Sequence, residues 1–140
     1  MCRLADWCVL ILLGIAGVMD WKKREVPVWL LILISAAVFP ITICCNSVNI
    51  WYRLSGAALG LTFFLVSRVT KEAVGYADSW LILILGIHLG IFLALQVLFA
   101  ASLMAAVVAV FYLWKRNWRR SETLPFIPFL VLAYIGVICV

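Results

Sequence analysis

Charged side chains are scarce in this chain. Only 12% of its 140 residues are Asp, Glu, Lys or Arg, whereas 68% are hydrophobic. A soluble domain of this length needs more polar side chains than this to cover its core, so the composition excludes that class and indicates a membrane protein. The net charge of +5 lies beside apolar runs, which favours attraction to anionic lipid over binding to nucleic acid.

The usual patterns of metal and thiol chemistry are also lacking. His88 is the only histidine, and no second ligand stands at metal-binding spacing from it, so we predict a hydrogen-bonded role and no metal. The five cysteines contain no C-x-x-C pattern, and we expect buried thiols. All five fall toward one predicted face, so a disulfide there stays open. No A-x-A cleavage site follows the first apolar run, which we therefore interpret as a retained span.

Six apolar runs are present, separated by short polar connections. Each has 16 to 19 residues, near the lower limit for crossing a hydrocarbon core of about 30 Å. Residues 80–114 carry no charge and would form a helix of about 52 Å if unbroken, so we predict a turn near residues 93–96. The sequence thus predicts one all-α integral membrane domain over residues 1–140, a bundle of six transmembrane helices at 4–19, 27–45, 54–69, 80–95, 97–114 and 124–140.

Basic residues alternate between the connections. They occur at residues 22–24 in the first, at Arg68 and Lys71 in the third and four times after Trp114 in the fifth, whereas the second has only Arg53 and the fourth has none. The positive-inside rule places these odd connections in the cytoplasm and both termini on the outer face. Within the bundle, the G-x-x-x-G pairs Gly56/Gly60 and Gly86/Gly90 predict close helix packing.

Two aspartates stand at the ends of apolar runs. Asp20 follows the first run and Asp78 precedes the fourth, so the charge rule places both at the cytoplasmic end. Two adjacent carboxylates can share a proton, one acting as base and the other as acid. Capping, or ion pairing with nearby Lys and Arg, is the alternative role for both. Asp6 lies 14 residues before Asp20, about 21 Å along a helix, and we expect it to cap the helix at the opposite face.

Three motifs surround these aspartates. A basic stretch runs from Asp20 to Pro27, Asp78 lies in the run G-Y-A-D-S-W-L that begins at Gly75, and residues 124–129 read L-P-F-I-P-F. Together they resemble the D-x-(basic)-I-P, G-x-G-D-x-K-L and I-P-F-G-P-F-L motifs of the type IV prepilin peptidases, which are GxGD membrane aspartic proteases. The resemblance covers nearly the whole chain and is to short members that lack the methyltransferase domain, including archaeal preflagellin peptidases.

The resemblance implies an aspartic endopeptidase in the plasma membrane of a prokaryote. Its substrate would be a prepilin-like protein whose basic leader precedes a hydrophobic helix and is removed at the cytoplasmic face. Asp20 and Asp78 would form the catalytic pair, without a cofactor or metal. Membrane lipid is the other expected partner, nucleic acid is not expected, and homo-oligomerisation stays open. Support of the site or binding of substrate would come from Gly75, Tyr76, Ala77, Lys23, Pro27, Glu72, Pro125 and Pro128.

Two positions depart from the family pattern. Ala77 stands where the family has Gly, and Trp80 stands where it has Lys. Alanine is strained where φ is positive, and the loss of Lys removes a cation that tunes the pKa of the neighbouring aspartate. Two alternative functions therefore stay open: a catalytically degenerate membrane scaffold, and a small ion-coupled carrier, which would need polar groups near the middle of the membrane.

Overall fold

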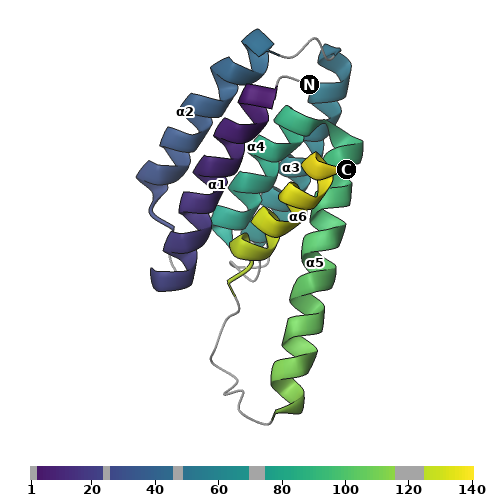
Figure 1. Cartoon of the computed structure of the whole chain (residues 1–140). Helices are drawn as coiled ribbons and strands as arrows, with labels where there is room; N and C mark the ends of the chain where they lie inside the picture. Colours follow the sequence, from purple (N-terminus) through teal and green to yellow (C-terminus); the bar gives the residue numbers. More distant parts are fainter. Residues whose placement is uncertain (1–2, 24–25, 46–48, 70–74, 116–124) are drawn as a thin grey trace.

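All the regular secondary structure in the described part of the chain is α-helical. The computed structural model describes residues 3–23, 26–45, 49–69, 75–115 and 125–140, and it contains no strand within them. The predicted all-α class is confirmed. The helices are α1 (Arg3–Lys23), α2 (Val28–Cys45), α3 (Ile50–Val69), α4 (Tyr76–Leu89), α5 (Ile91–Trp114) and α6 (Ile127–Cys139) (Figure 1).

Proline and glycine set several helix ends. Pro27 precedes α2, and its carbonyl accepts a hydrogen bond of 3.0 Å from the N–H of Leu30. Gly75 caps α4, and its carbonyl accepts from the N–H of Ser79 at 3.1 Å. Pro128 lies in the first turn of α6, where a missing N–H costs no intrahelical bond. The three sequence motifs thus coincide with the end of α1 and the starts of α2, α4 and α6.

The turn between α4 and α5 lies at Gly90, so the predicted turn at residues 93–96 is wrong. Gly90 has a φ of 77°, and its N–H donates to the carbonyl of Gly86 at 2.9 Å. Glycine tolerates this left-handed conformation, whereas other residues are strained in it. The chain therefore turns at the glycine that can adopt a positive φ, and not at the middle of the charge-free stretch. A Cβ at Gly90 would also collide with the ring of Tyr52 on α3, so the close packing predicted for Gly90 is confirmed.

Helices that follow one another in the sequence run in opposite directions, and both termini lie toward the same end of the bundle (Figure 1). The closest approach is between α3 and α4, where Gly56 faces Gly86 and Gly60 faces the backbone of Leu83. A Cβ at either position of α3 would collide with the backbone of α4. The close packing predicted for Gly56, Gly60 and Gly86 is therefore confirmed.

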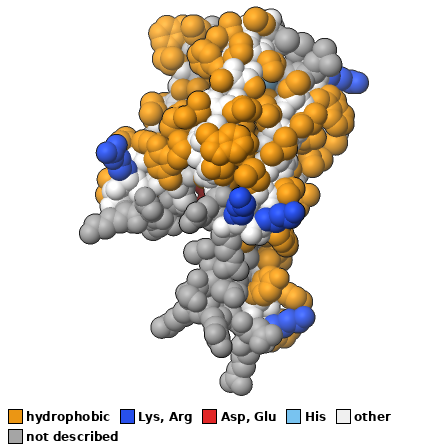
Figure 2. Space-filling view, turned by 90° about the vertical axis from the view of Figure 1, so that its left-hand side faces the viewer, with side chains coloured by type: hydrophobic (Ala, Val, Ile, Leu, Met, Phe, Trp, Pro, Cys, Tyr) orange, Lys and Arg blue, Asp and Glu red, His pale blue; other side chains and the backbone are white. Residues whose placement is uncertain are grey.

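The core and the surface are both apolar. Leu13 of α1, Leu31 of α2, Leu81 of α4 and Leu130 of α6 are buried in one cluster. Figure 2 shows hydrophobic side chains over most of the face in view, with basic side chains mainly toward its lower part. In the part of the chain that the structure describes, α3 and α5 are long and apolar enough to cross a membrane. The longest helix, α5, continues beyond the rest of the bundle at the end away from the termini (Figure 1).

Candidate functional site

Asp20 lies in the last turn of α1, beyond the apolar run of that helix, and is half-buried. Its carboxylate accepts a hydrogen bond from the backbone N–H of Ile127, the first residue of α6. The first N–H groups of a helix have no intrahelical acceptor and favour a negative charge. Burial raises the pKa of Asp20 above its ordinary value, and this hydrogen bond opposes the rise. The start of α6 therefore supports the ionised form of Asp20.

Asp78 lies in the first turn of α4, just before the apolar run of that helix, and is half-buried. Burial raises its pKa to about 7, and the negative charge of Asp20 contributes to the rise. The two carboxylates, 58 positions apart in the sequence, are thus brought into electrostatic contact. Two carboxylates that interact strongly enough can share a single proton over a range of pH. One carboxylate can then accept a proton while the other donates one.

Ser79 and an aromatic cluster fix the first turn of α4 against α3. Ser79 is fully buried, and its hydroxyl donates to the carbonyl of Phe63 at 3.5 Å and to that of Gly75 at 3.3 Å. The rings of Phe64, Tyr76 and Trp80 lie 5.2 to 6.2 Å apart, centroid to centroid. The aromatic packing gives Trp80 a structural role in α4. Sequence reasoning missed Ser79, although its position next to Asp78 was a signal.

The other predicted site residues that the structure describes lie at or near helix ends, as Asp20 and Asp78 do. Ala77 is inside α4, so its φ is helical and its Cβ causes no backbone strain. Lys23, Gly75 and Tyr76 are exposed, and Pro27, Pro125 and Pro128 are half-buried. Glu72 lies outside the described residues. Their roles in the site stay predictions. Within the described ranges, no cluster of three His, Cys, Asp or Glu side chains is present.

A second polar cluster lies toward the other end of the bundle. Asp6 Oδ1 lies 3.0 Å from His88 Nε2, and His88 Nδ1 lies 3.0 Å from Thr42 Oγ1. The hydrogen-bonded role predicted for His88 is confirmed. The capping role predicted for Asp6 is wrong, because Asp6 is the fourth residue of α1 and its buried carboxylate pairs with α4 instead. A buried carboxylate without a partner would be costly, and His88 supplies the partner.

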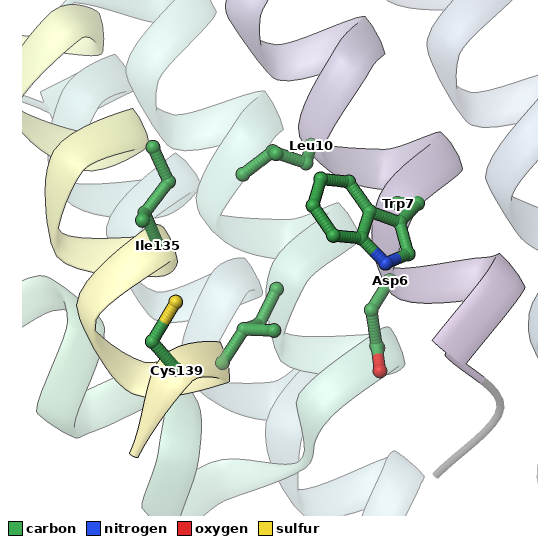
Figure 3. Close-up of a pocket in the computed structure, with 6 residues that line it drawn as sticks. Asp6, Trp7, Leu10, Ile135 and Cys139 are labelled. Atoms are coloured by element: carbon green, nitrogen blue, oxygen red, sulfur yellow. The ribbon is translucent and has the colours of Figure 1, made fainter.

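Asp6 also borders a small cavity between α1 and α6 (Figure 3). Its volume is about 50 Å³, which exceeds the space that one water molecule needs. The cavity lies at the end of the bundle away from Asp20 and Asp78, so it is not part of the carboxylate site. Apart from Asp6, the residues that line it are Trp7, Leu10, Ile135, Ile138 and Cys139.

The predicted burial of the cysteines is wrong for three of them. Cys8, Cys44 and Cys139 are free thiols with exposed side chains. They lie on the outside of the bundle, where large apolar residues such as Trp7 and Ile43 are exposed as well. The side chains of Cys2 and Cys45 fall outside the described part of the structure.

The described part of the chain is thus helical, with two helices long and apolar enough to cross a membrane and two half-buried aspartates at helix ends. The comparison with protein families gives the particular group. A model of the type IV leader peptidase family matches residues 7–110, which include Asp20 and Asp78. This is more than half of the chain, and the protein belongs to that family. No curated protein and no solved structure gives a significant match.

Proposed function

We propose that this protein is an aspartic endopeptidase that removes the basic leader of prepilin-like substrates at the cytoplasmic face of a prokaryotic plasma membrane. Membership of the leader peptidase family supports a peptidase with such a substrate. The observation that carries the catalytic assignment is the electrostatic contact between Asp20 and Asp78. It supports a pair that holds one proton, the state in which two carboxylates serve as acid and base together.

The surroundings of the two carboxylates favour different roles for them. Asp20 accepts the hydrogen bond from Ile127 N–H, which favours its ionised form and suits it to take a proton from water. Asp78, with a pKa of about 7, keeps its proton more readily and is suited to donate it to the scissile carbonyl oxygen. The resulting hydroxyl adds to the carbonyl carbon and forms a neutral diol. When the C–N bond breaks, Asp20 passes its proton to the amine and Asp78 regains one from the diol.

We further propose that all six helices form one membrane domain with both termini on the outer face. The alternating directions of the helices and the common end of the termini support this arrangement (Figure 1). Lys22, Lys23 and Arg68 lie at the helix ends near the carboxylate pair, and Lys115 follows the far end of α5. Basic residues at one end favour a cytoplasmic location for that end. The catalytic pair would then meet the leader where it joins the hydrophobic helix of the substrate.

The test is cleavage of a synthetic substrate by the purified full-length chain in lipid vesicles. The substrate carries a basic leader, a glycine and a hydrophobic run, and mass spectrometry locates the cut. We expect cleavage at the end of the leader by the wild type and by the control variant Cys8→Ser, and none by Asp20→Asn or Asp78→Asn. A wild-type protein that leaves the substrate intact would favour the scaffold, and one that instead moves protons across the vesicle would favour the carrier.

A further inference from the structure

The two helices that carry the catalytic pair are not each other's main packing partners. α1 packs mainly against α6 and α2, and α4 packs mainly against α3 and α2. The separation of Asp20 and Asp78 therefore depends on how α1 and α4 are held relative to one another through other contacts. Catalysis by a carboxylate pair needs its geometry to be fixed closely, since small displacements of reacting groups cost large factors in rate.

The hydrogen bond between Asp6 and His88 joins these same two helices away from the catalytic pair. Asp6 lies 14 residues before Asp20 on α1, and His88 lies 10 residues after Asp78 on α4. These spacings correspond to about 21 Å and about 15 Å along the helix axes. The link is thus far from the chemistry, yet it is built on the two helices whose relative position sets the catalytic geometry.

The surroundings of this link favour a rigid connection. Asp6, His88 and Thr42 are 6%, 4% and 1% exposed, so their hydrogen bonds are shielded from bulk water. A hydrogen bond to a carboxylate is stronger than a neutral one, and a low dielectric strengthens it further. Thr42 of α2 holds the other ring nitrogen of His88, which fixes the orientation of the imidazole. Three helices therefore converge on one buried contact.

We propose that Asp6 and His88 are positioning residues, whose hydrogen bond fixes α1 against α4 and thereby holds Asp20 at its working distance from Asp78. The catalytic consequence rests on the function proposed above, whereas the structural consequence does not. Breaking the link lets the helices tilt or slide, which separates the two carboxylates. Their electrostatic interaction then weakens, because it falls with distance.

The electrostatic interaction of the pair can be measured through its titration. Burial and the charge of Asp20 both raise the pKa of Asp78, and both effects decrease if the two helices move apart. Among the residues that the structure describes, the charged side chains at the ends of α1 and α3 near the pair are Lys22, Lys23 and Arg68, all of them exposed. The segments α2, α5 and α6 contain no Asp, Glu, Lys or Arg. A substitution at Asp6 alters none of these groups. A change in the apparent pKa of the pair therefore reports on Asp20 and Asp78 themselves.

The experiment is an infrared titration of the full-length protein in lipid vesicles, following the protonated carboxyl band that Asp78→Asn removes. In Asp6→Ala we expect the upper apparent pKa of the pair to fall by at least about 0.5 pH units, as expected for charges that move a few ångström apart. Asp6→Asn keeps a side-chain oxygen at the same place and should restore most of the wild-type value. In Val9→Ala, which opens a cavity one turn away in the same helix, the titration should not change.

The outcomes separate the positioning role from a merely structural one. An Asp6→Ala protein that titrates like the wild type, or a Val9→Ala protein that shifts as much, would overturn the proposal. If Asp6→Ala does not fold, the variant Thr42→Val takes its place, because it removes only the hydrogen bond that orients His88. We expect Thr42→Val to lower the upper apparent pKa of the pair by a smaller amount. An unchanged titration of Thr42→Val would then overturn the proposal. If Asp6→Ala shifts as expected but the wild-type protein cleaves no leader, the proposed peptidase is refuted and the positioning role stands.

Discussion

Replacing Asp78 with asparagine should stabilise the protein at alkaline pH while abolishing its activity. The ordinary pKa of an aspartate side chain is 3.8. Burial, together with the negative charge of Asp20, raises the pKa of Asp78 to about 7. The folded state therefore binds the proton more tightly than the unfolded state, and this group destabilises the fold progressively as the pH rises from about 4 to about 7. At about 1.4 kcal/mol per pH unit, the cost above pH 7 is about 4 kcal/mol at most.

Asparagine has nearly the same shape as aspartate and carries no charge, so Asp78→Asn should escape this cost. We expect thermal unfolding of the purified protein in detergent to show a higher Tm for Asp78→Asn than for the wild type at pH 8, and a much smaller difference at pH 4. Circular dichroism at the two pH values measures both. A variant that unfolds below the wild type at pH 8, or a difference that does not depend on pH, would refute the assignment of a buried, coupled carboxylate to Asp78.

Three further predictions concern the pair and its supports. Because neither carboxylate works alone, the double variant of Asp20 and Asp78 to asparagine should lose no more leader cleavage than either single variant, and additive losses would contradict the shared role. Gly56→Ala should lower the free energy of unfolding by about 1 to 3 kcal/mol, because the added Cβ meets the backbone of α4. The control Gly14→Ala, whose Cβ meets nothing within 4 Å, should leave the free energy of unfolding unchanged, and equal denaturation curves for the two variants would contradict the packing. Ile127→Pro removes the N–H that Asp20 accepts from, so the acid limb of the pH–rate profile should move to higher pH, while Ile127→Val should leave it in place.

The sequence allowed the all-α class and the approximate places of the helices to be predicted. Apolar runs between polar connections predicted six helices, and the structure has helices in all six places. Asp20 and Asp78 stand next to charged connections in the sequence, and they lie at helix ends in the structure. These features are local, because the composition and the spacing of nearby residues determine them. The family motifs added the expectation of a shared role, which spacing alone did not provide.

The remaining features depend on contacts between distant parts of the chain. Asp6 and His88 are 82 positions apart, and no local pattern indicates that α1 and α4 bring them together. The turn at Gly90 lies in a stretch of nearly uniform hydropathy, where only the backbone conformation of one glycine decides the position. The family motif indicates the loss of a cation at Trp80, whereas the structure packs the Trp80 ring against Phe64 on a different helix. In each case a tertiary contact outweighs the local sequence.

The central claim is that Asp20 and Asp78 share one proton, and the pH–rate profile of leader cleavage tests it most directly. The purified wild-type protein in lipid vesicles is assayed across the pH range with the synthetic leader substrate, at substrate concentrations well below KM, so that the profile reports kcat/KM of the free enzyme. We predict a bell-shaped profile with two macroscopic pKa values, whose alkaline limb falls near pH 7, where Asp78 loses its proton. A rate that continues to rise or stays level through pH 8 would contradict the account.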